Sequence, residues 1–219
     1  MTVGYKRSGR TRTSAPETIW VPKTKLGKMV LNGEIVSIED VFAQGLKIQE
    51  PEIVDKLLPD LKDEVLSMNI VQKQTDAGEQ TRFKVLVVVG NENGYVGVGS
   101  GKAKQIRAAI EKAKMYAKMS ITPIRRGCGS WECACDKQHS FPFRTVGKCG
   151  SVKVELLPGP RGLGVVANDI SSVILKIAGV KDCWSRSFGS TETTSSLALA
   201  VCDALKNTYR IVTPQDWVG

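Results

Sequence analysis

Apolar and polar residues alternate along this chain in a way that predicts two α+β units behind a polar N-terminal stretch. Residues 1–18 contain almost no apolar side chains, which is typical of a flexible arm that becomes ordered on a partner. We assign residues 1–50 to this arm and a short helix. Residues 51–119 predict helix, three antiparallel strands and helix, and residues 120–219 predict a small sheet with two helices.

Local signals place the first helices. Ser37 with Asp40 three residues later resembles a helix N-cap with its carboxylate partner, and Gly45 would end that short helix. Pro51 can open the next helix, because the first helical position needs no backbone N–H. Apolar residues then recur at helical spacing as far as Leu66, although a proline at position 59 should break or kink the run.

Strands are expected at 68–75, 81–89 and 95–99, with a turn at 91–94. A helix should follow over about 102–119, and its inward stripe is expected to be Ala103, Ile106, Ile110, Ala113 and Ala117.

The second unit is predicted by the same signals. Strands are expected at 121–126, 143–146 and 151–157, and an extended stretch at 180–188. One helix should be capped by Asn168 or Asp169 and closed by Gly179, and a last helix should span 193–206.

Charge is segregated along the chain, which has a formal net charge of +9. Residues 1–30 hold seven basic and one acidic side chain, and residues 71–130 hold eleven and four. Residues 31–70 are acidic, with three basic and nine acidic side chains, and the partner of this segment stays open. Two basic blocks favour a polyanion such as nucleic acid over a protein that is merely basic.

Composition also excludes some classes of protein. No run of about 18 apolar residues occurs, so we expect no membrane segment, and the basic N-terminus lacks the apolar stretch of a secretory signal. Six cysteines in 219 residues are too sparse for a disulfide framework, which fits a reducing, cytoplasmic compartment.

The glycine-rich stretch 94–104 suggests a phosphate site, but it fails both nucleotide patterns. A Walker loop ending at Gly101 and Lys102 would need a glycine at Val96 and a hydroxyl at Ala103. A dinucleotide fingerprint would need glycine at Lys102 or Lys104. We therefore expect no nucleotide cofactor.

The alternating glycines have a simpler interpretation. Gly97, Gly99 and Gly101 share one face of a strand, which lets another backbone or a sugar-phosphate approach closely. Lys102 and Lys104 would then occupy the first turn of a helix, as in double-stranded-RNA-binding domains, where free N–H groups favour an anion. A solvated helix with ordinary surface lysines explains the pattern equally well.

Seven separated motifs together resemble the universal small-subunit ribosomal proteins of the S-five family, in its archaeal and eukaryotic branch. They are WVPKTKLGKMV (20–30), LKDEVL (61–66), VQKQTDAGEQTRFK (71–84), NGYVGVGSGKAKQIRAAIEKAK (93–114), ITPIRRG (121–127), GKCGSVKVELLPGPRGLGVV (147–166) and AGVKDCWSRSFGS (178–190).

The resemblance implies a fold and a function. The fold would be a double-stranded-RNA-binding-like domain and a C-terminal domain with a left-handed strand–helix–strand crossover. The protein would be a non-enzymatic component of the small ribosomal subunit that binds ribosomal RNA and supports decoding accuracy and the mRNA entrance. Its protein neighbours would belong to the S-three, S-four and S-eight families.

Matching positions and the basic arm give the expected phosphate contacts. Lys102 and Lys104 could instead face a protein neighbour. The expected RNA-binding residues are Lys6, Arg7, Arg10, Arg12, Lys73, Gln74, Arg82, Lys84, Lys102, Lys104, Arg107, Arg125, Arg126, Lys148 and Arg161.

A further group of residues suits a metal. Cys128, Cys133, Cys135 and His139 follow the spacing C-x4-C-x-C-x3-H, and three thiolates with one imidazole suit a closed structural zinc site. The alternative is a set of loop cysteines beside a surface histidine. Archaeal-type members of the family look similar in GCGSWEC, which favours an archaeal source. The H-x-E and P-C-x-x-C patterns of zinc deaminases are absent, so catalytic zinc is not expected.

Two other functions stay open from the sequence. A free RNA-binding regulator could use the same first domain, with salt-dependent RNA binding. A zinc- or cysteine-dependent RNA-modifying enzyme would need a convergent catalytic cluster, which the sequence does not show. The four tryptophans are too scattered to suggest a stacking platform.

Overall fold

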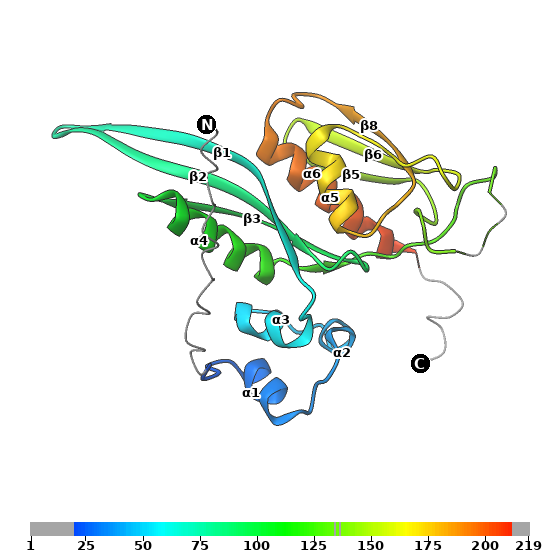
Figure 1. The fold of residues 1–219 in the computed structure, drawn as a ribbon, viewed down its shortest axis with the longest axis horizontal. Coiled ribbons are helices and arrows are strands. Elements are labelled where there is room, and N and C mark those ends of the chain that lie inside the picture. The colour runs from blue at the N-terminus through cyan, green and yellow to red at the C-terminus, as the bar shows by residue number, and fades with distance from the viewer. Residues whose placement is uncertain (1–19, 134, 136, 212–219) are drawn as a thin grey trace, which may run out of the picture.

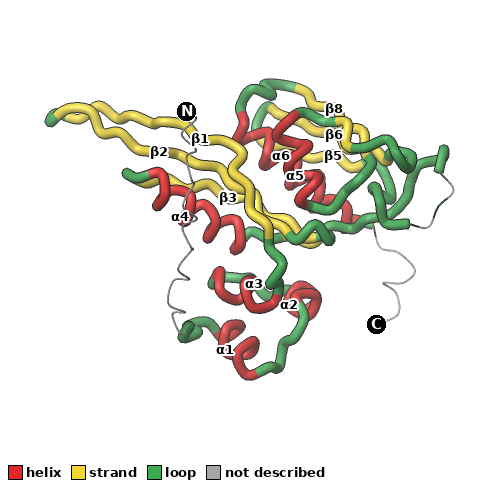
Figure 2. The backbone as a smooth tube through the Cα atoms, viewed as in Figure 1, coloured by secondary structure: helices red, strands yellow, loops and turns green. Residues whose placement is uncertain are grey.

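The computed structural model describes residues 20–133, 135 and 137–211, so the arm residues Lys6, Arg7, Arg10 and Arg12 lie outside the described part. Figures 1 and 2 show a group of short helices, a long hairpin with its sheet, and a second sheet with two helices. The elements are α1 Lys25–Asn32, α2 Ile38–Ala43, α3 Pro51–Leu57, β1 Lys62–Thr75, β2 Gly78–Gly90, β3 Tyr95–Ala103, α4 Ile106–Met119, β4 Thr122–Pro123, β5 Thr145–Cys149, β6 Val152–Pro158, β7 Val165–Val166, α5 Asp169–Ile177, β8 Cys183–Phe188, α6 Thr194–Lys206 and the 3-10 turn Asn207–Arg210. Among the described helices, none is long and apolar enough to cross a bilayer.

Local capping explains the N-terminal helices. The capping box of Ser37 and Asp40 starts α2, and Pro51 occupies the start of α3, as expected. The sequence did not predict α1, which the Thr24 hydroxyl caps by accepting from the Gly27 N–H at 3.1 Å. The helix expected beyond α3 is wrong, because the chain leaves α3 at Leu57 and enters β1 at Lys62.

The first sheet has the strand order β1-β2-β3-β4 and is antiparallel throughout. β1 pairs with β2 from Lys62 to the turn at Thr75 and Gly78, whereas β3 pairs with β2 only as far as Phe83. The end of the hairpin therefore projects beyond the sheet as a two-stranded ribbon (Figure 1). β4, expected in the second unit, pairs with β3 and so extends the first sheet past residue 119.

α4 covers one face of this sheet, and small residues let it approach closely. A Cβ atom added to Gly99 or Gly101 would lie less than 3 Å from the α4 backbone at Ala113. The glycine pattern thus accommodates a backbone, one of the two expected uses. The predicted boundary is wrong: α4 begins at Ile106, which leaves Lys102 in β3.

The inward stripe of α4 also differs from the expected one. Ala109, Ala113 and Ala117 are fully buried, whereas Ile106 is 39% exposed. Close contact between helix and sheet selects the smallest side chains for the contacting face, and the larger apolar residues move to its margin.

The opposite face of the first sheet packs against the C-terminal unit. The second sheet has the order β5-β6-β8-β7, and α5 connects the parallel strands β7 and β8. α5 and α6 lie between the two sheets, in one hydrophobic core that includes Leu86 and Val88 of β2 and Leu156 of β6. This arrangement confirms an α+β fold with a strand–helix–strand crossover, and the left-handed sense of that crossover stays a prediction.

Candidate nucleic-acid interface and Cys/His cluster

The hairpin of β1 and β2 carries basic side chains on one of its faces. Val85, Val87 and Val89 of β2 pack beneath α4. Because successive side chains of a strand point to opposite faces, Arg82 and Lys84 lie on the face away from α4.

Strand register adds two more cations to this face. Lys102 of β3 lies directly opposite Lys84 of β2. Val71 of β1 lies opposite Arg82, so Lys73, two residues further along β1, points the same way. We call Lys73, Arg82, Lys84 and Lys102 the basic face.

The basic face is electrostatically unfavourable in the isolated protein. Side chains directly opposite on antiparallel strands have Cβ atoms about 4.5–5.5 Å apart, and like charges in such a pair repel. Within the described part of the chain, no acidic side chain forms an ion pair with a residue of the basic face. An anion bound there would relieve the repulsion between Lys84 and Lys102.

The other face of the hairpin has a different character. Gln74 lies opposite Glu79, and the amide of Gln72 donates to the Glu79 carboxylate at 3.2 Å. The pleat therefore separates Gln74 from Lys73, its neighbour in sequence and in the expected RNA-binding set. Because the acidic side chain of Glu79 lies on this other face, the face that carries Lys73, Arg82, Lys84 and Lys102 has no acidic side chain between Lys73 and Lys102.

The cations on and next to α4 divide into two kinds, of which only the first, Lys104 and Arg107, was expected to bind RNA. Lys104, in the connection from β3, and Arg107, in the first turn of α4, are exposed. Further along α4, Lys114 contacts Asp63 at 2.7 Å and Lys118 contacts Asp55 at 2.6 Å. The lysines at 114 and 118 thus have internal partners.

These contacts give part of the acidic segment 31–70 an internal role. Asp55 and Asp63 bind the α4 lysines, as described above. The Glu50 carboxylate accepts hydrogen bonds from the Trp20 ring at 3.0 Å and from the Thr24 N–H at 2.7 Å. Although burial raises the pKa of Glu50, these hydrogen bonds outweigh it and the net pKa is lowered.

Arg125 and Arg126 have structural partners. The Arg125 guanidinium donates to the Ile211 carbonyl at 3.0 Å and lies over the Tyr209 ring. Arg126 donates to the Gly179 carbonyl at 3.3 Å and to the Asn93 side chain, and burial lowers its pKa. Both side chains therefore join distant segments of the fold.

Lys148 and Arg161 lie apart from the basic face, in the C-terminal unit. Lys148 is exposed on β5 opposite Lys153, and Arg161 is exposed in the loop between β6 and β7. The structure does not bring these two side chains together with the hairpin cations.

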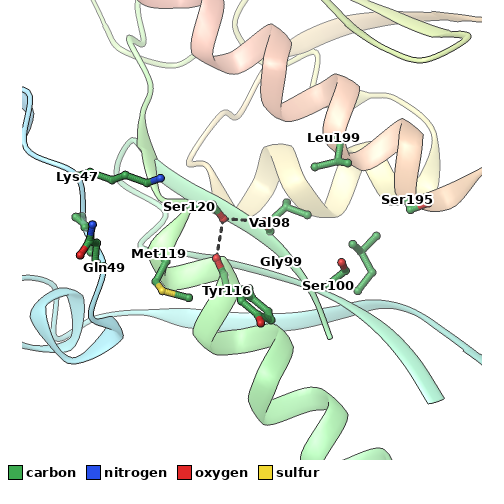
Figure 3. Close-up of a pocket in the computed structure, with 12 residues that line it drawn as sticks. Lys47, Gln49, Val98, Gly99, Ser100, Tyr116, Met119, Ser120, Ser195 and Leu199 are labelled. Carbon is green, nitrogen blue, oxygen red and sulfur yellow. Dashed lines mark hydrogen bonds between the residues drawn. The ribbon is translucent and has the colours of Figure 1, made fainter. Parts of the chain in front are cut away.

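A cavity of about 690 Å³ lies along the edge of β3, between α4 and α6. Figure 3 shows residues that line it. The Ser120 hydroxyl donates to the Val98 carbonyl at 2.8 Å within it. Among the described residues that line it, Lys47 and Tyr116 are the ionisable ones, so the lining offers no acid–base pair or metal-ligand set.

Cys128, Cys133, Cys135 and His139 converge, and we call them the Cys/His cluster. One potential ligand atom from each residue lies within 4.8 Å of all the others. The His139 Nε2 atom is 3.3 Å from the Cys135 sulfur and 3.9 Å from the Cys133 sulfur. A hydrogen bond between these two thiols, at 3.1 Å, raises the pKa of Cys133 and lowers that of Cys135 to about 7.

Asp182 supports the cluster from a second loop. Its carboxylate contacts His139 Nδ1 at 2.8 Å and accepts from the Gly162 and Gly164 N–H groups at 3.1 and 2.9 Å. Both Asp182 and His139 are buried. Sequence reasoning missed Asp182, which lies 43 positions after His139 and belongs to no motif with it.

Two tryptophans come together beside the cluster, contrary to the expectation that they are scattered. Trp131 and Trp184 line a cavity of about 520 Å³ with Arg186. Trp131, on the loop that carries the cluster, is 92% exposed. A large, exposed aromatic side chain of this kind is typical of a surface that contacts a partner.

Comparison with known proteins identifies the family. The model described as Ribosomal protein S5, N-terminal domain, matches residues 61–125, and that of its C-terminal domain matches residues 147–216. The curated "Small ribosomal subunit protein uS5" of Thermofilum pendens is 56% identical over 198 residues, covering 90% of this chain and 98% of that protein. The Staphylothermus marinus protein of the same name is 57% identical over 199 residues, covering 91% and 93%. The two domain matches in order and the archaeal relatives confirm the resemblance seen in the motifs, and the chain belongs to the ribosomal protein S5 family.

Proposed function

We propose that this protein is a structural component of the small ribosomal subunit, where it binds ribosomal RNA through the basic face and contacts neighbouring ribosomal proteins. Family membership supplies the ribosomal setting and a non-enzymatic role. The observation that carries the proposed RNA contact is the pair Lys84 and Lys102, held opposite each other with no acidic partner in the described part of the chain. Phosphate oxygens are the ligands that such a cluster of cations prefers.

The finer part of the proposal concerns position within the subunit. The hairpin of β1 and β2 would lie nearest the decoding region and the mRNA entrance, with neighbours of the S-three, S-four and S-eight families. The resemblance carries this assignment. It is supported by the reach of the hairpin, whose tip extends beyond the sheet and is exposed on both strands.

Charge reversal tests the basic face. In Lys84→Glu/Lys102→Glu, two cations that we place on phosphates become anions, while the strands keep their backbone pairing. Binding to purified small-subunit ribosomal RNA should weaken. The slope of log K against log salt concentration, which is negative, should become less steep by about 2. Filter binding across a salt series measures both quantities.

The matched control is the same double charge reversal elsewhere, at Lys28 of α1 and Lys112 of α4, both exposed. It changes net charge equally but leaves the basic face intact. Equal losses in the two double variants would show that net charge alone determines RNA binding, and the proposed interface would be wrong.

Sedimentation separates the proposal from a free RNA-binding regulator. Native lysate is run on a gradient before and after a high-salt wash. A ribosomal component remains stoichiometric with small subunits, because buried protein contacts resist screening. A regulator held by phosphate contacts alone would move to the free fraction, and that result would overturn the ribosomal assignment.

A further inference from the structure

We propose that the Cys/His cluster binds one zinc ion in a closed, four-coordinate site that fastens two loops of the C-terminal unit together. The inference concerns residues outside the basic face and stands independently of the RNA-binding proposal. Its ligands are three cysteine sulfurs and His139 Nε2, a donor set that suits Zn²⁺.

The geometry fits a single ion. A tetrahedral zinc with bonds of about 2.3 Å to sulfur and about 2.0 Å to nitrogen separates its sulfur–nitrogen and sulfur–sulfur ligand pairs by roughly 3.5–3.8 Å. The distances from His139 Nε2 to the sulfurs of Cys135 and Cys133, 3.3 and 3.9 Å, lie close to that range. The spread of the four ligand atoms, all within 4.8 Å of one another, leaves room for one ion and is too tight for an iron–sulfur cluster.

The buried contact with Asp182 prepares His139 for this role. When the Asp182 carboxylate accepts a hydrogen bond from Nδ1–H, the proton stays on Nδ1 and the Nε2 lone pair is free. Nε2 is the atom that faces the thiols. A carboxylate behind the ligating histidine is the usual outer partner in zinc sites. The alternative, a surface histidine beside unrelated loop cysteines, predicts an exposed imidazole. His139 is instead buried and contacts the Asp182 carboxylate.

The ligand count indicates a structural site. Four protein ligands fill a tetrahedral zinc, whereas catalytic sites keep one position for water or substrate. Neither the cavity of about 520 Å³ beside the cluster nor the cavity of about 690 Å³ along β3 is lined by one of the four cluster residues. The zinc would therefore hold the fold in place.

The zinc site would connect the loop that carries the Cys/His cluster to the loop that carries Arg161. Asp182 also accepts from Gly162 and Gly164, so the metal, His139 and Asp182 form one chain of contacts to the loop that carries Arg161. Zinc would thus fix the 128–139 loop, with exposed Trp131, against the Arg161 loop.

Metal analysis of the purified full-length chain is the first test. We expect one zinc per chain by elemental analysis. Exchange for Co²⁺ should give the visible bands of tetrahedral cobalt and the near-ultraviolet charge-transfer bands of bound thiolates. Less than half an equivalent of zinc after purification with added zinc would overturn the proposal, as would a disulfide between two of the three cysteines.

Variants locate the ion. Cys135→Ser should reduce bound zinc below half an equivalent, whereas the matched control Cys149→Ser, outside the cluster, should retain one equivalent. Asp182→Asn keeps all four ligands and should bind zinc about 10–100-fold more weakly. Full zinc retention in Cys135→Ser would overturn the assigned ligands.

Hydrogen exchange tests whether zinc connects the two loops. It uses the unmodified chain, so the result does not require a variant to fold. Removal of zinc by a chelator should speed amide exchange at Gly162 and Gly164, which donate to Asp182. Amides of the buried strand β2 serve as the internal control and should be unchanged. Unchanged exchange at the two glycines would show that the metal does not fasten the Arg161 loop.

Discussion

At Gly99, the absence of a side chain determines how closely α4 approaches the sheet. A Cβ atom there would overlap the α4 backbone near Ala113 and Ala117. We expect Gly99→Ala to destabilise the protein by about 1–3 kcal/mol, because a well-packed interface must separate to admit the methyl group. Ser100→Ala, the neighbouring and exposed position, is the control. Urea denaturation of both variants measures the difference, and equal stabilities would contradict the close-packing argument.

Glu155 is a residue at which pH should act on stability. It is 4% exposed and contacts Lys153 at 2.8 Å and Arg144 at 2.7 Å. The hydrogen bond from Lys153 is the main cause that lowers its pKa below the usual 4.5. The folded carboxyl therefore binds its proton at lower pH than the unfolded one, so its stabilisation is present above about pH 4.5 and is lost as pH falls further.

Glu155→Gln should remove that pH-dependent contribution. The unfolding free energy of the variant should fall less steeply than that of the parent as pH decreases below 4.5, the usual pKa. Chemical denaturation at a series of pH values measures the slope. Glu192→Gln, at an exposed position, is the control, and parallel curves for the parent and Glu155→Gln would refute the role of the buried carboxylate.

At the scale of helices and strands, the sequence predicted those helix starts that depend only on adjacent residues. The capping box at Ser37 and the proline at position 51 located α2 and α3, since capping and proline geometry depend on adjacent residues. The sequence could not show that Val65 belongs to a strand, because helical spacing and a half-exposed strand share the same short apolar pattern. The sequence could not predict that Lys84 lies opposite Lys102, which depends on strand register, or that His139 contacts Asp182, which depends on tertiary packing.

The projecting part of the hairpin should be dispensable for folding. Val71 and Arg82 face each other, so a two-residue Asn-Gly turn can replace residues 72–81 and reconnect the strands. The removed residues are exposed or half-buried, and the shortened protein should keep its stability to within about 1 kcal/mol. Its thermal midpoint measures this, and a large loss would show that the ribbon helps to hold the sheet.

For the molecule as a whole, the shared core between the sheets matters more than the division into two family domains. Leu197 of α6 is fully buried in a cluster that also contains Val88 of the first sheet and Val154 of the second. A core shared in this way couples the two units, because opening either one exposes apolar surface of the other. Leu197→Ala should cost about 2–5 kcal/mol and should lower the protection of amides in β2 and β6 together. Native-state hydrogen exchange measures both strands in one experiment, and loss of protection in β6 alone would mean that the two domains unfold independently.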